Sequence, residues 1–158
     1  MINANELVAK LRPLNKERLR DLGDILQYAI PWSALAALAL VMADRADAWR
    51  WLYIGLTTGL FTALLKFLFN FTPLGTRPDG GDDAMPSGHT SSAFMGAGFF
   101  HFQFGIEWAI VPYLLAALTG YSRVVAKRHW PRDVVVGAAL AILINYIFFN
   151  YVTVDVPI

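Results

Sequence analysis

A histidine, a proline and an aspartate stand together at the start of the last apolar stretch of the chain. His129, Pro131 and Asp133 occupy alternate positions in the run His-Trp-Pro-Arg-Asp. Proline favours the first position of a helix, so we expect His129 just before a helix N-terminus and Asp133 in the first turn. Asp133 would then accept a hydrogen bond from one imidazole nitrogen and leave the other free to attack. The helix N-terminus would favour an incoming anion.

A second histidine follows a polar loop, in the run Pro86-Ser87-Gly88-His89. Serine and threonine after a proline are typical of helix starts. If a helix begins here, its free N–H groups around Gly88 and His89 form an anion site, with the Ser87 hydroxyl as a further donor. Arg77, earlier in the same loop, would add positive charge. The combination favours phosphate chemistry over simple helix capping.

Two more cations lie near these motifs. Lys66 is inside the apolar run 61–71, where a charge is costly unless it finds a partner or reaches the membrane interface. We therefore predict a functional role for Lys66, with a lysine that merely reaches the interface as the alternative. Arg123 precedes His129 in the second polar segment, 122–132. Taken singly, each of these residues could equally be part of an ordinary ion pair.

The segments that must position these residues are strongly apolar. Of 158 residues, 56% are hydrophobic and 16% are charged, and the mean hydropathy is +0.46. Long apolar runs with short polar connections indicate a membrane protein rather than a soluble domain. A net charge of +1 gives no basic field for nucleic acid. Cysteine is absent, which excludes disulfides, thiolate zinc sites and cysteine nucleophiles.

We predict an all-α integral membrane bundle in a single domain, residues 1–158, with about five transmembrane helices. The predicted spans are residues 25–43, 49–70, 90–104, 107–121 and 133–152. The third and fourth form a hairpin that turns near Gly105. Within the second span, Gly55 and Gly59 lie four residues apart, which predicts the close approach of another helix.

Residues 1–23 form a charged leader ahead of the helical core, residues 24–152. We expect an amphipathic helical segment on the membrane surface, divided by Pro13, with a solvated leader as the alternative. In a five-span layout this leader and the loops 71–88 and 122–132 emerge on one membrane face, so the loops can form one site. By the positive-inside rule that face of the cell inner (cytoplasmic) membrane is cytoplasmic, and an outward site is the alternative. The leader cations are Lys10, Arg12, Lys16, Arg18 and Arg20.

Together these residues resemble the type 2 phosphatidic acid phosphatases, which share their site with bacterial acid phosphatases and vanadium haloperoxidases. Pro86-Ser87-Gly88-His89 is similar to the family's second motif. Ser122-Arg123, His129 and Asp133 are similar to the third motif in residue type and spacing.

The first motif of the family differs here, because ten residues separate Lys66 from Arg77. This spacing is longer than the family pattern. We predict that the extra residues, within 70–76, bulge out of the loop, since Thr72-Pro73-Leu74-Gly75 has turn chemistry. The alternative is that Lys66 no longer reaches the phosphate.

The resemblance implies a phosphatase that uses no metal or other cofactor. His129 would form a phosphohistidine held by Asp133, and His89 would protonate the leaving alkoxide and later activate water. The implied phosphate-binding groups are Lys66, Arg77, Ser87, Gly88 and Arg123. Phosphoryl transfer needs mainly positioning and charge stabilisation, which these groups supply. A divalent ion is the alternative, but ligand spacing is absent and the run 79–83 is typical of a solvated turn.

The expected substrate is a lipid phosphate that enters from the bilayer with its tails between helices. The family implies phosphatidic acid, phosphatidylglycerol phosphate, polyprenyl diphosphates such as undecaprenyl diphosphate, and lipid A phosphates, and the sequence favours none of them. The alternatives are a lipid phosphotransferase, a vanadate-dependent oxidase, and a non-enzymatic lipid-binding protein with vestigial motifs. The expected partners are membrane lipids and not nucleic acid, and no oligomeric state is predicted.

Overall fold

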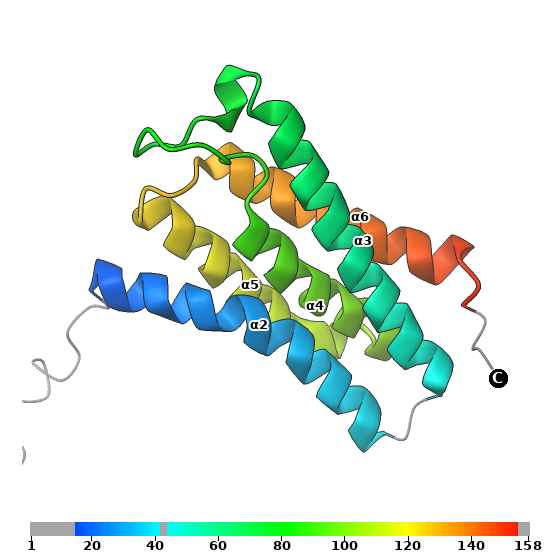
Figure 1. Ribbon diagram of the computed structural model, residues 1–158. Helices are drawn as coiled ribbons and strands as arrows, with labels where there is room; N and C mark the ends of the chain where they lie inside the picture. Colours follow the sequence, from blue (N-terminus) through cyan, green and yellow to red (C-terminus); the bar gives the residue numbers. More distant parts are fainter. Residues whose placement is uncertain (1–14, 42–43, 155–158) are drawn as a thin grey trace, which may run out of the picture.

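The computed structural model describes residues 15–41 and 44–154, and this part of the chain consists of helices joined by loops, without a strand (Figure 1). A 3-10 helix, η1 (Pro73–Gly75), lies in the loop before α4. The α-helices are α2 (Lys16–Leu40), α3 (Arg45–Phe69), α4 (Gly88–Phe104), α5 (Ile106–Val125) and α6 (Pro131–Tyr151). The all-α prediction is confirmed for the described residues. The part of the predicted leader that contains Lys10, Arg12 and Pro13 lies outside them.

Three local predictions about helix ends are confirmed. Pro131 occupies the first position of α6, and Asp133 lies in the first turn. Gly105, with φ of 100°, separates α4 from α5 as the turn of the hairpin. α4 begins at Gly88, within the predicted helix start.

Two helix boundaries differ from the prediction. α2 begins at Lys16, so the end of the predicted leader forms the first turns of this helix. Leu19 is buried there in register with Leu26, which explains why the helix continues through the charged segment. α5 continues to Val125, so Arg123 lies on the last turn of a helix rather than in a loop.

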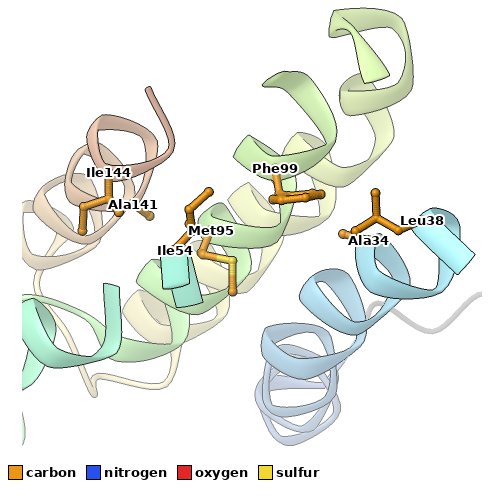
Figure 2. Packing of buried hydrophobic residues seen from close by; sticks show 7 residues of the cluster. All are labelled: Ala34, Leu38, Ile54, Met95, Phe99, Ala141 and Ile144. Atoms are coloured by element: carbon orange, nitrogen blue, oxygen red, sulfur yellow. The ribbon is translucent and has the colours of Figure 1, made fainter. Parts of the chain in front are cut away.

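α4 is the central helix and packs against the other four. Its small residues allow close approach: a Cβ on Gly96 would lie 2.5 Å from the backbone nitrogen of Pro31, and one on Gly98 would lie 2.8 Å from Nδ2 of Asn145. Side chains of α4 form an apolar cluster with side chains of α2, α3 and α6 (Figure 2). Its buried members are Ala34, Leu38, Ile54, Met95, Phe99, Ala141 and Ile144. The central helix is thereby fixed on several sides.

Three of the described helices, α3, α5 and α6, are long and apolar enough to cross a membrane. Apolar side chains also cover the outside, as with Leu60, which is 67% exposed, and Leu114, which is 66% exposed. A large apolar exterior is expected of a helical protein in lipid. These features support a helical membrane protein, while the count of five spans stays a prediction because α2 and α4 do not meet the same criteria.

Five helix ends gather at one end of the bundle (Figure 1). They are the start of α2, the end of α3, the start of α4, the end of α5 and the start of α6. The loops before α4 and before α6 also meet there, and Nε1 of Trp130 donates to the carbonyl oxygen of Thr76 at 3.0 Å. The prediction that the two polar segments come together is confirmed.

Candidate active site

His129 lies between α5 and α6 and is only 4% exposed. Its Nδ1 is 2.7 Å from the carbonyl oxygen of Ala84. A carbonyl oxygen only accepts, so Nδ1 carries the proton and Nε2 of the neutral ring keeps its lone pair. Burial lowers the pKa of His129 to about 3; the charge of Lys66 also lowers it, and the Ala84 hydrogen bond opposes the shift. His129 is therefore neutral near pH 7, with one nitrogen available for attack.

Asp133 makes a different contact from the predicted one. Its Oδ2 lies 3.7 Å from Nδ1 of His129 and instead accepts from the backbone N–H of Trp130 at 2.8 Å. The third helical position directs the carboxylate back to the helix cap, and the Ala84 carbonyl takes the imidazole hydrogen. The predicted hydrogen bond between Asp133 and His129 is absent, although the fully buried carboxylate remains beside the ring.

His89 lies in the first turn of α4 and contacts a residue that the sequence reasoning missed. Its Nε2 is 2.8 Å from Oδ1 of Asp24 on α2. The same oxygen accepts from Nη1 of Arg123 at 2.5 Å. Arg123 also donates from Nε to the hydroxyl of Ser122 at 3.0 Å and from Nη2 to the carbonyl oxygen of Arg20. Asp24 thus joins the second histidine to the buried arginine.

The sequence position of Asp24 explains why it was missed. It is 65 residues from His89 and 99 residues from Arg123, so no local motif connects the three. In the sequence it only marked the start of the first apolar run. The available signal was a carboxylate at the edge of an apolar run, where a charge costs free energy unless it is paired.

An open cavity of about 860 Å³ unites most of the predicted residues. Lysines and arginines outnumber carboxylates on its wall, so it favours an anion. The predicted residues that line it are Lys66, Arg77, Gly88, His89, Arg123 and His129. The other charged residues that line it are Lys16, Glu17, Arg20, Asp24, Asp79, Lys127 and Arg128.

Lys66, on the last turn of α3, lines the cavity together with Arg77 despite the longer spacing between them. The extra residues turn through η1, whose capping residue Thr72 accepts from the N–H of Leu74 at 3.2 Å. Lys66 donates to the carbonyl oxygen of Asp83 and lines the same cavity as Arg77. Nε of Arg77 is buried without an acceptor among the described residues, so a bound oxyanion would satisfy it.

Ser87 is the predicted phosphate-binding residue that the structure does not bring to the cavity wall. Its side chain is fully buried, and its hydroxyl oxygen accepts from Oγ1 of Thr90 at 3.0 Å. Its backbone N–H donates to the carbonyl oxygen of Asp133 at 3.0 Å. These contacts hold the start of α4 against the start of α6, so Ser87 fixes the positions of the two helix ends.

The acidic loop residues form a turn, as predicted. Oδ1 of Asp79 accepts from the N–H of Gly81 at 3.1 Å, and Oδ2 accepts from Nη1 of Arg128 at 3.1 Å. Asp82 and Asp83 are exposed. Across residues 15–41 and 44–154, no group of three or more His, Asp or Glu side chains is arranged to hold a metal ion.

A narrower groove of about 280 Å³ runs between α3 and α4. Lys66 and Gly88 line both the groove and the cavity, so the two adjoin at these residues. A Cβ on Gly59 would meet nothing within 4 Å, whereas one on Gly55 would lie 3.2 Å from Cε of Met95. The close helix approach predicted from the two glycines is therefore wrong at Gly59, which leaves open space beside the helix.

Three relatives resemble parts of this chain. A segment of 73 residues is 44% identical to the lipid A 1-phosphatase of Porphyromonas gingivalis, and one of 64 residues is 42% identical to the lipid A 4'-phosphatase of Helicobacter pylori. These segments are 44% and 40% of this chain but only 16% and 32% of those proteins. The undecaprenyl-diphosphatase BcrC of Bacillus subtilis is 28% identical over 140 residues, which cover 80% of this chain and 71% of the relative. No solved structure gives a significant match.

The family model described as the PAP2 superfamily matches residues 47–156. This region contains every site residue predicted from the sequence, and it excludes α2 with Asp24. The match covers more than half of the chain and confirms the resemblance to the type 2 phosphatidic acid phosphatases. The chain therefore belongs to the PAP2 superfamily.

Proposed function

We propose that this chain is a membrane-embedded phosphatase that releases phosphate from a lipid phosphate through a phosphohistidine. The observation that supports this most directly is the tautomer of His129. Its Nδ1 donates a hydrogen bond to the carbonyl oxygen of Ala84, and the ring lines a cavity rich in cations. His89 lines the same cavity as a second proton-transfer group. The relatives named lipid A phosphatases and undecaprenyl-diphosphatase support a lipid phosphate as substrate.

In the first step Nε2 of His129 attacks the phosphorus atom of the substrate. The N–P bond forms as the P–O bond to the lipid breaks, and the leaving oxygen takes a proton from His89. Arg77, Arg123 and Lys66 would hold the phosphoryl oxygens together with the backbone N–H of Gly88. These donors are in place before the reaction, so they stabilise charge on the oxygens without reorganisation.

In the second step water attacks the phosphorus atom of the phosphohistidine. His89, now neutral, takes a proton from the water as the N–P bond breaks and its electron pair returns to Nε2 of His129. Inorganic phosphate leaves, and both histidines are back in their starting states. One nucleophile and one acid/base group are sufficient for this cycle.

The groove between α3 and α4 supports a lipid rather than a water-soluble substrate. It extends from Lys66 and Gly88, which also line the cavity, along α3 to Gly59 and Gly55. Its volume of about 280 Å³ fits one hydrocarbon chain over part of its length. The phosphate would occupy the polar cavity while a chain of the lipid lies along Gly59.

We also propose that the site faces the cytoplasmic side of the cell inner membrane. The start of α2 lies at the same end of the bundle as the site, and it brings Lys16, Arg18 and Arg20 to that face. Lysine and arginine beside a span favour the cytoplasmic side.

The chemical half of the proposal is tested by phosphate release from a panel of detergent-solubilised lipid phosphates, with and without EDTA. We expect release by the wild-type protein to survive EDTA and to be abolished in His129→Ala. His101→Ala is the matched control, because His101 lies at the far end of α4, beside Tyr113. Release of phosphate that persists in His129→Ala would refute the proposal. Transfer of phosphate to a second lipid in place of release would identify a phosphotransferase.

The lipid half is tested by Gly59→Phe with phosphate esters of increasing alkyl chain length. A phenyl ring at this open position fills the groove, so kcat/KM for long chains should fall about tenfold, while short-chain esters react as in the wild type. Leu60→Phe is the control, because Leu60 faces outward and lies outside the groove. An unchanged preference for chain length in Gly59→Phe would contradict a chain in this groove.

A further inference from the structure

We propose that Asp24 is a positioning residue for this reaction, which holds His89 and Arg123 in their working orientations. The inference rests on the proposed function, and it makes α2 part of the active site. Asp24 lies on α2, outside the region 47–156 that matches the family. The proposal therefore concerns a part of the site that the family motifs do not contain.

The geometry around Asp24 fixes the state of His89. One carboxylate oxygen of Asp24 lies 2.8 Å from Nε2 of His89. An ionised carboxylate only accepts hydrogen bonds, so Nε2 must carry its hydrogen and point toward α2. Nδ1 is then the nitrogen that exchanges a proton with the leaving oxygen and later with water. Burial and the charge of Arg123 lower the pKa of His89, and the hydrogen bond and charge of Asp24 oppose this shift, so Asp24 favours the protonated acid before the first step.

The same oxygen restrains Arg123. Three groups contact the guanidinium: Asp24, the hydroxyl of Ser122 and the carbonyl oxygen of Arg20. Two of the three belong to α2. A guanidinium has five N–H donors, so donors remain for the oxygens of a phosphate. A pre-oriented arginine loses less side-chain freedom when the phosphate binds.

Gly23 explains how α2 comes close enough for these contacts. A Cβ at this position would lie 2.0 Å from the hydroxyl oxygen of Ser122 and 2.7 Å from Nη2 of Arg123. Only a residue without a side chain permits this approach. The Asp24 side chain is itself 44% exposed toward the cavity, whereas its partner Arg123 is 4% exposed, so the pair lies at the cavity wall and not in the apolar core. A function in the reaction explains the arrangement better than core packing does.

The role of Asp24 is tested with substrates that differ in their leaving group. An alkyl phosphate requires a proton on the leaving oxygen, whereas p-nitrophenyl phosphate releases a stable phenolate without one. In Asp24→Asn we expect kcat for the alkyl phosphate to fall about 10- to 100-fold. The first-turnover burst of nitrophenolate should stay within about threefold of the wild type, because the Ser122 hydroxyl and the Arg20 carbonyl oxygen still hold Arg123. Slower turnover should follow, because water activation still needs His89.

Asp24→Glu and Asp21→Asn complete the set. Asp24→Glu restores a carboxylate and should recover part of the alkyl phosphate activity. Asp21 is on the same helix, its side chain is 61% exposed and it pairs with Arg20, so Asp21→Asn should behave as the wild type. Thermal unfolding midpoints of all variants report any loss of folding.

The possible results separate this inference from the proposed function. A wild-type protein that releases no phosphate from any substrate would refute the function itself. If the wild type is active, equal losses on both substrates with the burst abolished would overturn the positioning of His89. An Asp24→Asn protein with wild-type activity would overturn it as well. A selective loss on the alkyl phosphate, with folding unchanged and partial rescue by Asp24→Glu, is the result we expect.

Discussion

The two histidines of the site are held in different ways. His129 is 4% exposed, and its Nδ1 donates to a backbone carbonyl of the loop that precedes α4. His89 is partly exposed to the cavity, and its Nε2 donates to the side chain of Asp24 from another helix. The proposed nucleophile is therefore oriented by the main chain, and the proposed acid/base by a carboxylate. Disturbances of α2 should impair proton transfer and spare the nucleophile.

The sharpest separation of the two roles comes from removing each histidine in turn. His129→Ala should lower turnover by about 10⁴-fold or more on every substrate and form no phosphoenzyme, because no nitrogen remains to attack. His89→Ala should lose about 10²- to 10⁴-fold on alkyl phosphates yet keep a burst from p-nitrophenyl phosphate. Acid-quenched labelling of the protein with phosphate measures the intermediate. Labelling of His129→Ala at the wild-type level would show that His129 is not the nucleophile.

Moving α2 without touching its carboxylate should give the next largest effect. Gly23→Val places methyl groups where Ser122 and Arg123 now lie, so α2 must shift away. We expect turnover of alkyl phosphates to fall about 10- to 100-fold, while the nitrophenolate burst weakens less, because Arg123 is displaced but the nucleophile is not. Ala36→Val, at an exposed position of α2, is the control. Loss of the burst in Gly23→Val alone would mean that α2 also positions the nucleophile.

Asp133→Asn should have a modest effect. Where a carboxylate itself fixes the tautomer of a nucleophilic system, its loss costs about 10⁴-fold. Here the Ala84 carbonyl accepts from Nδ1, so we expect Asp133→Asn to lower kcat by about tenfold or less. Asp133→Ala should in addition destabilise the protein by about 1 kcal/mol, because it removes the cap on the Trp130 N–H. A loss of kcat above about 10³-fold in a folded Asp133→Asn protein would assign the orienting role to Asp133.

The smallest expected change concerns the protonation of His129, which should not vary with pH in the folded protein near neutrality. Burial lowers the pKa of His129 from 6.5 to about 3, so its ring should stay neutral from pH 8 to about pH 4.5. Nitrogen chemical shifts of labelled histidine, assigned with His129→Ala, measure this state. In the unfolded chain the same ring takes up a proton below about pH 6.5, so its contribution to stability falls as the pH drops from there toward 3. A midpoint near 6 for His129 in the folded protein would contradict its buried, neutral state.

Residues whose positions follow from nearby sequence were predicted well. Pro131 fixes the start of α6, and through it the places of His129 and Asp133, because proline suits a first helical turn. Gly105 marks the hairpin for a similar local reason. In each case the backbone conformation depends on one residue type and its immediate neighbours.

Contacts that depend on packing between helices could not be predicted in this way. Asp24 meets His89 because Gly23 lets α2 lie against α5, and neither Asp24 nor Gly23 belongs to a recognisable motif. The Ala84 carbonyl is a main-chain atom, which every residue possesses. Ser87 matched a motif, yet its hydroxyl turned inward to Thr90 because the starts of α4 and α6 pack together.

The carbonyl of Ala84 has a consequence for anyone who searches this protein for inactive variants. A main-chain acceptor cannot be deleted by exchanging one amino acid for another. Any single substitution at Ala84 therefore keeps the carbonyl oxygen that accepts from Nδ1 of His129. Insertions or deletions within residues 70–84 change the path of the loop and move the acceptor itself. The nucleophile should therefore tolerate many substitutions in that loop and few changes in its length.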